Sequence, residues 1–221
     1  MELTIEQYLI PNCSLIIDEL NIAYKNCSAD EMKKVADKSF SETDMMMRVG
    51  YPFKNMARYT TKTEDSDDSG KTNHDIFIEN KRFKIELKYL RSWRTQSGTY
   101  SCSKGWKEIQ YDFNWLLSEI NNDNKGKSAF IIAWFNCVDS FSKIIQLGEG
   151  KGGKPLVNES KLCFFPFLIR PQLPTRTADL EYNYEIAYQR LQITPIGYKG
   201  KECNCTFVGK ESDCFHFAIY Y

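Results

Sequence analysis

The stretch of residues 75–88 constrains the fold more than any other part of the chain, because it alternates apolar and polar residues around a short turn. Alternation with a period of two is typical of half-buried strands, so residues 76–78 and 82–88 predict the two strands of a hairpin. Asn80-Lys81 fits a two-residue loop, which fixes the strand register. The face predicted to enter the core consists of Ile76, Ile78, Phe83, Ile85 and Leu87.

This register predicts a cluster of charged side chains on the opposite face of the hairpin. Asp75 lies directly across from Glu86, with the two Cβ atoms roughly 5 Å apart, and Lys84 and Lys88 share their face. Two carboxylates this close ionise together only if a cation lies between them, and hard oxygen ligands favour Mg²⁺ or Mn²⁺. Lys88 could polarise an attacking water, as a catalytic base, and offset charge on a scissile phosphate. An ordinary amphipathic hairpin with a solvated charged face is the alternative.

The string His74-Asp75, a gap and then Glu86-Leu87-Lys88 resembles the core motif of the PD-(D/E)XK nuclease superfamily, in which proline usually stands at the position of His74. The resemblance implies metal ligands at Asp75 and Glu86 and a catalytic lysine at Lys88. It implies a metal-dependent endonuclease that hydrolyses phosphodiester bonds, with DNA favoured over RNA as the substrate. An RNA-cleaving toxin or defence effector with the same core, or an inert nucleic-acid-binding module, are the alternatives. A competing frame of the motif, with Asp68, Glu79 and Lys81, would place the last two residues in the turn.

Basic residues concentrate around this motif, although the chain as a whole carries 29 cationic and 29 acidic residues. Between residues 81 and 107 there are eight Lys or Arg and one acid, Glu86. Such focusing is suited to phosphate contact, and a solvated basic loop is the alternative. The candidate nucleic-acid-binding residues are Lys84, Arg91, Trp93, Arg94, Lys104, Lys107 and Gln110.

The remaining pattern predicts an α/β fold with a central mixed sheet flanked by helices. One helix or a broken pair of helices is expected over residues 3–26 and another helix over 29–49. A strand is expected near 57–61, an amphipathic helix over about 103–121 and a buried strand over 128–138. This order fits the α-β-β-β-α-β core that the resemblance implies, which is restriction-endonuclease-like.

In that superfamily a glutamate on the helix before the sheet sometimes joins the metal site, and Glu42 is the candidate here. The alternative for Glu42 is an acid that stabilises the start of its helix. The helix after the lysine strand commonly adds an auxiliary polar or basic residue, for which Lys107 and Gln110 are candidates.

The C-terminal segment predicts a β-hairpin elaboration with possible metal ligands. If Gly209-Lys210 is a two-residue loop, soft ligands converge on one side of the ribbon and could bind Zn²⁺. A cross-strand disulfide and simple burial of the thiols are the alternatives. The candidate ligands are Cys203, Cys205, Cys214 and His216.

The 221 residues are long enough for one full core, so a single nuclease-like domain over residues 1–221 is expected. It divides into N-terminal helices (1–55), a catalytic core (56–147) and a C-terminal elaboration (148–221). Within the last part, residues 161–169 predict a strand and residues 180–191 a helix. With eight cysteines and no export signal or membrane span, we expect reduced thiols in a cytoplasm. A homodimer is plausible for cleavage of both strands.

Overall fold

The computed structural model of the protein describes most of the chain. The described residues are 3–59, 74–91, 102–122, 125–137, 141, 148–149, 156–171, 173, 179–195, 197–198 and 200–221.

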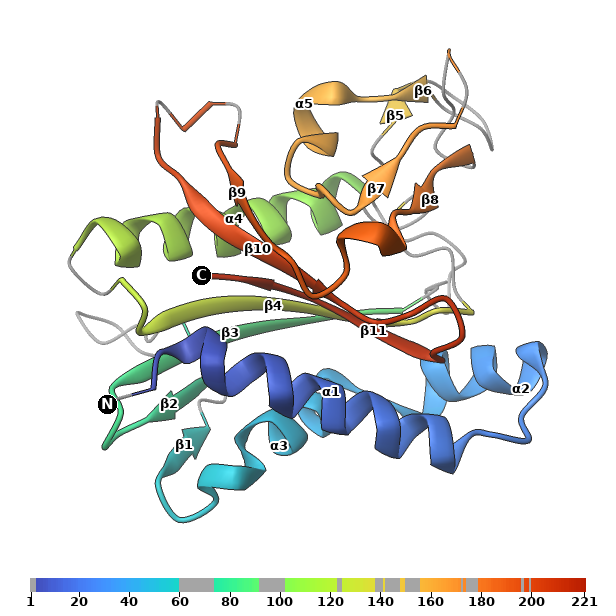
Figure 1. Cartoon of the computed structure of the whole chain (residues 1–221), viewed down its shortest axis with the longest axis horizontal. Coiled ribbons are helices and arrows are strands. Elements are labelled where there is room, and N and C mark those ends of the chain that lie inside the picture. The colour runs from blue at the N-terminus through green and yellow to red at the C-terminus, as the bar shows by residue number, and fades with distance from the viewer. Residues whose placement is uncertain are drawn as a thin grey trace.

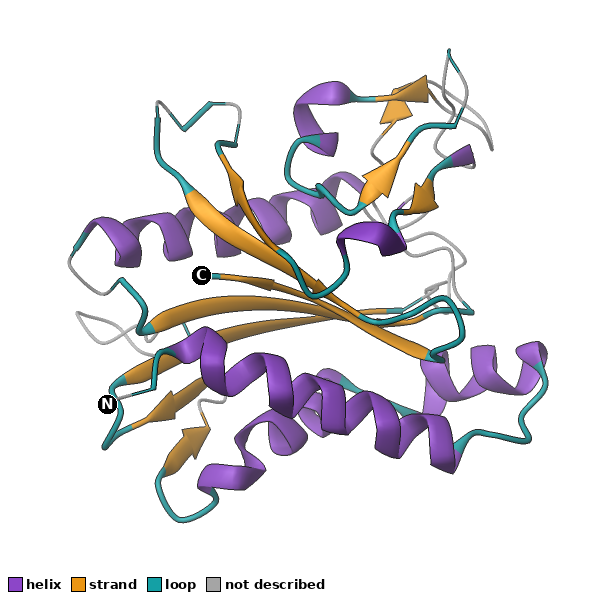
Figure 2. Ribbon diagram, in the orientation of Figure 1, coloured by secondary structure: helices purple, strands orange, loops and turns teal. Residues whose placement is uncertain are grey.

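A mixed seven-stranded sheet forms the centre of the molecule, in the order β1-β2-β3-β4-β11-β10-β9 (Figure 2). Only β3 and β4 run parallel among these neighbours, and α4 (Cys102–Asn121) supplies the crossover between them. The strands are β1 (Ala57–Tyr59), β2 (Ile76–Ile78), β3 (Phe83–Leu90), β4 (Ser128–Phe135), β9 (Arg190–Ile193), β10 (Cys203–Val208) and β11 (Phe215–Tyr220). The predicted α/β class with a central mixed sheet flanked by helices is therefore confirmed.

Helices cover both faces of the sheet, with α1 and α3 on one side and α4 on the other (Figure 1). Each face has its own hydrophobic cluster, and β4 contributes to both because its side chains alternate between them. Ile131 and Phe135 point toward α1 and α3, whereas Ile132 and Trp134 point toward α4. Every residue of β4 is buried, as expected for a strand read from a continuous apolar run.

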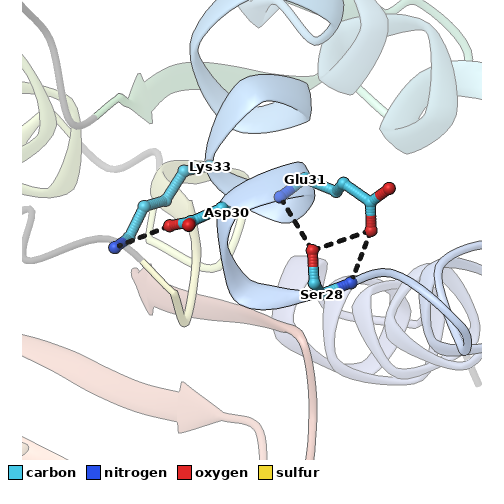
Figure 3. Close-up of polar contacts among 4 residues, drawn as sticks. All are labelled: Ser28, Asp30, Glu31 and Lys33. Atoms are coloured by element: carbon cyan, nitrogen blue, oxygen red, sulfur yellow. Dashed lines mark hydrogen bonds and ion pairs between the residues drawn. The ribbon is translucent and has the colours of Figure 1, made fainter.

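The N-terminal region forms more helical segments than predicted. They are α1 (Ile5–Ala23), α2 (Ala29–Lys34), a π-helical turn η1 (Val35–Ser39), α3 (Glu42–Gly50) and a 3-10 turn η2 (Tyr51–Phe53). The predicted single helix over 29–49 is broken because Phe40 is extended and packs into the core, and Ser41 then caps a new helix. Ser28 caps α2 by the same reciprocal arrangement, with Glu31 bonding back to the Ser28 N–H at 2.8 Å (Figure 3).

Two predictions for the C-terminal third are wrong. Residues 161–169 form the end of a short helix, α5 (Glu159–Leu162), and a two-residue strand, β7 (Leu168–Ile169), which pairs with β8 (Glu181–Tyr182). Residues 180–191 form β8, a 3-10 turn η5 (Tyr184–Ile186) and the start of β9. The aromatic residues there pack against Phe207, and the Tyr188 N–H donates to the Phe207 carbonyl, so tertiary contacts override the helical spacing.

The predicted C-terminal hairpin exists, and it completes the central sheet instead of standing beside it. β11 pairs with β4 along six residues, and β10 and β9 follow outward. A further two-stranded sheet joins β5 (Gly148–Glu149) to β6 (Leu156–Val157). No helix among the described residues is both long and apolar enough to cross a membrane.

Candidate active site at the end of β2

The β2–β3 hairpin has the register that the sequence predicts. Ile76 pairs with Ile85 and Ile78 with Phe83, and the Arg82 N–H closes the turn on the Glu79 carbonyl at 3.2 Å. The predicted apolar face is buried in full against α1 and α3. The opposite face therefore carries the charged residues, and α4 lies over it (Figure 1).

Two carboxylates continue the hydrogen bonding of β3 beyond Ile76, the first residue of β2. The Asp75 backbone N–H still donates to the Ile85 carbonyl at 2.9 Å, and the Asp75 carboxylate then accepts the Leu87 N–H at 2.9 Å. Two residues further, the Glu42 carboxylate accepts the Tyr89 N–H at 3.0 Å. Because Glu42 is the first residue of α3, the start of that helix is fixed against β3.

The side chains of β3 on the other face meet acidic residues of α4. The Lys88 ammonium lies 3.8 Å from a carboxylate oxygen of Asp112. Four residues earlier on β3, Lys84 forms an ion pair with Glu119 of α4 at 2.8 Å. Asp75, Glu86 and Asp112 are all at most 4% exposed, so these three carboxylates are held away from bulk water.

The charge around Lys88 decides its ionisation. Burial disfavours its ammonium form, but the carboxylates of Glu42, Asp112, Glu108 and Glu86 outweigh burial and raise the pKa of Lys88 above its ordinary value. Lys88 is therefore an ammonium ion at neutral pH. Several carboxylates gathered around this lysine in a low-dielectric setting leave an excess of negative charge, which favours the binding of a further cation.

Next to this cluster, His74 is half-buried. Burial lowers its pKa, and the positive charge of Lys84 lowers it further, whereas the Glu119 carboxylate opposes that trend. His74 is thus held neutral beside Asp75.

The structure brings together four of the predicted site residues, namely Glu42, Asp75, Glu86 and Lys88. The predicted nucleic-acid contacts are more scattered. Lys84 is engaged by Glu119, the Arg91 guanidinium lies 5.8 Å from the Tyr89 ring centre, and Lys107 is exposed on α4. Gln110 hydrogen-bonds the side chain of Tyr198. Trp93, Arg94 and the side chain of Lys104 lie outside the described residues.

The acids of α4 were missed by the sequence analysis. Asp112 falls inside the apolar stripe of the helix, between Ile109 and Phe113, yet it is 3% exposed. A carboxylate at a core-facing helical position is itself a signal, because burial of an uncompensated charge is strongly unfavourable. Glu108 lies one turn earlier on the same side of the helix, at the spacing of neighbours on a helix surface.

The predicted zinc cluster depends on a register that is wrong. Cys205 pairs with Tyr220 and Val208 with Phe217, so the turn between β10 and β11 is longer than the predicted two residues, Gly209 and Lys210. Gly209 has a φ of 149°, and the His216 ring lies so close that a Cβ there would be 2.2 Å from Cδ2.

As a result, the four candidate zinc ligands do not converge. Cys203 and Cys205 are buried among the aromatic residues on the α4 side, whereas Cys214 packs against the other cluster. His216 is enclosed by rings and bonds the Lys210 carbonyl through Nε2. Burial raises the pKa of the Cys203 thiol to about 12, as expected for inert, buried thiols.

The described residues contain no group of three or more His, Cys, Asp or Glu side chains arranged to hold one metal ion. Mg²⁺ is commonly bound through one or two carboxylates, with water and substrate phosphates completing the coordination. Asp75 and Glu86 are buried carboxylates at positions that face each other across the β2–β3 hairpin, and their oxygens are of the chemical type that Mg²⁺ prefers.

A scan against protein-family models finds no match to the chain, and searches of curated proteins and of solved structures find no significant match either. What the protein does must therefore be inferred from its own residues and their geometry.

Proposed function

We propose that this protein is a metal-dependent nuclease that hydrolyses phosphodiester bonds, with DNA as the favoured substrate. The observation that carries the proposal is the meeting of Glu42, Asp75, Glu86 and Lys88 beside the start of β2. These residues come from one helix, α3, and from the β2–β3 hairpin, and each is hydrogen-bonded to the β3 backbone or lies on β3 itself.

The arrangement of elements supports this proposal. In chain order α3, β1, β2, β3, α4 and β4 follow one another, with β1, β2 and β3 antiparallel and β4 parallel to β3. This is the α-β-β-β-α-β order of the restriction-endonuclease-like core. The element order therefore supports the proposal of that fold, in which β11, β10 and β9 would extend the sheet of the core.

In the proposed reaction Asp75 and Glu86 would hold Mg²⁺ or Mn²⁺, and Glu42 would add negative charge beside them. A bound divalent ion supplies a bound water of lowered pKa and a clamp for the phosphate oxygens. As an ammonium ion, Lys88 would not take the proton of the attacking water as a base would; that proton would pass to solvent, and Lys88 would donate hydrogen bonds to the phosphate and offset the charge that develops there. The Lys88 side chain is 16% exposed, which leaves room for a phosphate to approach it.

The proposal is tested by cleavage of supercoiled plasmid, single-stranded DNA and RNA in Mg²⁺ and in Mn²⁺. Asp75→Asn and Glu86→Gln remove the charges while keeping oxygen acceptors, so the bond from the Leu87 N–H can persist. We expect each to lower the cleavage rate about a hundredfold or more. Lys88→Met is expected to do the same.

Glu79→Gln is the matched control, because Glu79 is an exposed acid in the turn of the same hairpin and pairs with Arg58. Its activity should remain within about twofold of the wild type. Cleavage that survives EDTA, or that Asp75→Asn leaves intact, would contradict the mechanism. A preference for RNA would change the proposed substrate from DNA to RNA and leave the proposed catalytic residues unchanged.

A second measurement separates a metal site from an inert charged cluster. Mg²⁺ that binds the folded chain must raise its unfolding temperature, and the rise should disappear in Asp75→Asn. An unchanged unfolding temperature in millimolar Mg²⁺ and Mn²⁺, together with absence of cleavage, would leave these residues as a structural ion network.

A further inference from the structure

Two ion pairs join α4 to β3, and they differ in a way that suggests different roles. Lys84 and Glu119 are 2.8 Å apart, with side chains 31% and 16% exposed, as in an ordinary pair at the edge of the structure. Lys88 and Asp112 are 3.8 Å apart, with side chains 16% and 4% exposed. The second pair is therefore looser in distance but more deeply buried.

A carboxylate at position 112 of α4 is unfavourable for stability, because its charge is removed from water. Asp112 occupies the helix face that carries Ile109, Phe113 and Leu116, all of which are at most 1% exposed. A buried ion pair often stabilises a protein no better than apolar residues of similar size, so stability alone is a poor explanation for a carboxylate here. The position fits a residue whose purpose is to hold the lysine opposite it.

We propose that Asp112 is a positioning residue that holds the Lys88 ammonium for the hydrolysis. The inference rests on the proposed function, and it assigns a role to a residue of α4 that lies outside the acid–acid–lysine motif. A lysine side chain has four flexible bonds, so charge partners on more than one side favour a fixed position of its ammonium. Glu42 and Glu86 act from the side of β3, while Asp112 and Glu108 act from α4.

A positioning role predicts a specific kinetic result. An error of about 1 Å in the placement of a catalytic group can cost a hundredfold in rate. Asp112→Asn should therefore lower kcat about 10- to 100-fold and leave KM within about twofold, since the loss is confined to the transition state. Asp112→Glu, which restores the charge, should recover at least part of the lost kcat.

The matched control is Glu119→Gln, which breaks the other ion pair between the same helix and the same strand. It should leave kcat within about twofold. In a Lys88→Met background, Asp112→Asn should have no further effect on kcat, because the residue on which it acts is gone. Equal losses of kcat in Asp112→Asn and Glu119→Gln would overturn the inference, as would fully additive effects with Lys88→Met.

A readout independent of cleavage keeps the inference separable from the proposed function. The ¹⁵N resonance and order parameter of the Lys88 ammonium, measured by NMR, should show an immobilised group in the wild type and a mobile one in Asp112→Asn. If the wild type cleaves nothing, the proposed function fails, and these spectra still decide whether Asp112 holds Lys88. An ammonium that is equally ordered in both proteins would refute the inference whatever the activity.

Discussion

His216 is a titratable side chain enclosed by aromatic rings on β11. It is 0% exposed, and its Nε2 lies 3.0 Å from the Lys210 carbonyl. Burial lowers the pKa of His216 to about 4, and the Lys210 carbonyl and the Asp213 carboxylate only partly oppose this. The rings around it, with centres 5.4 to 5.7 Å away, belong to Trp134, Tyr182, Tyr184 and Phe207.

This burial makes stability depend on pH in a predictable direction. Between pH 6.5 and 4 the unfolded chain binds a proton at residue 216 that the folded chain does not, so stability falls as the pH falls through that window. The loss at pH 4.5 relative to pH 7 should be about 2 to 3 kcal/mol from this group. Urea unfolding of the wild type and of His216→Gln at both pH values measures it. His216→Gln should lose less by that amount, and equal losses in the two proteins would contradict the assignment.

At the scale of single residues, the sequence predicts which residues of the candidate site lie together only where a local pattern, such as alternation around a short turn, sets their positions. Asp75, Glu86 and Lys88 were recognised because alternation and a two-residue turn define their register without reference to the rest of the fold. Asp112 belongs to the same cluster but faces Lys88 only after α4 has docked on β3. No pattern within α4 predicts how the helix packs on β3, although an acid among the apolar residues of a helix indicates that it meets a charged partner there.

At the scale of elements, the start of α3 connects helix capping to the site. The Ser41 hydroxyl oxygen accepts a hydrogen bond from the Asp44 backbone N–H at 3.2 Å, and the Asp44 carboxylate accepts one from the Ser41 backbone N–H at 2.7 Å. Glu42 directly follows Ser41, and its carboxylate accepts the Tyr89 N–H of β3. Because the cap fixes the first turn of α3, it also helps to fix the position of the Glu42 carboxylate.

Removing the cap should affect both stability and activity. Ser41→Ala is expected to cost about 1 kcal/mol of unfolding free energy and, by loosening Glu42, to lower the cleavage rate severalfold. Ser28→Ala removes the equivalent cap of α2, shown in Figure 3, and should cost a similar free energy with no change in rate. Chemical denaturation and plasmid cleavage of both variants test this. A parallel drop in rate for the two would show that stability alone, and not Glu42, is responsible.

Elements with long-range partners were the ones that sequence patterns misjudged. Gly209-Lys210 has the composition of a tight turn, but the close approach of Gly209 to His216 belongs to a longer turn. Tyr184 and Tyr188 have helical spacing, but their neighbours in space are β10 and His216. In both cases the decisive contacts are made with another strand, β11 for Gly209 and β10 for Tyr188, and periodicity within a segment carries no information about them.

At the scale of the whole molecule, β4 is the strand that joins the two hydrophobic clusters. Ile131 and Ile132 are adjacent in the chain and both 0% exposed, but they belong to opposite faces of the sheet. The β3–β4–β11 centre of the sheet therefore links the helices on its two sides. A protein built in this way is expected to unfold as one unit.

Matched substitutions on β4 test that expectation. Ile131→Ala and Ile132→Ala should each cost about 2 to 5 kcal/mol and should shift a single unfolding transition. Fluorescence, to which Trp106, Trp115 and Trp134 of the cluster on the α4 side contribute, and far-UV circular dichroism should give the same midpoint in each variant. Two separate transitions in Ile132→Ala, with the α1 side intact, would show that the two faces unfold independently.

The short length of β2 has a consequence for the behaviour of the protein in solution. β2 is three residues long and β3 is eight, and carboxylates take the N–H groups of Leu87 and Tyr89 where a longer β2 would have paired. Exposed strand edges are templates for pairing with another chain, and negative charge along an edge prevents it. Asp75 and Glu42 cover these N–H groups of β3, and a chain that loses both carboxylates should leave them open to pairing with another chain.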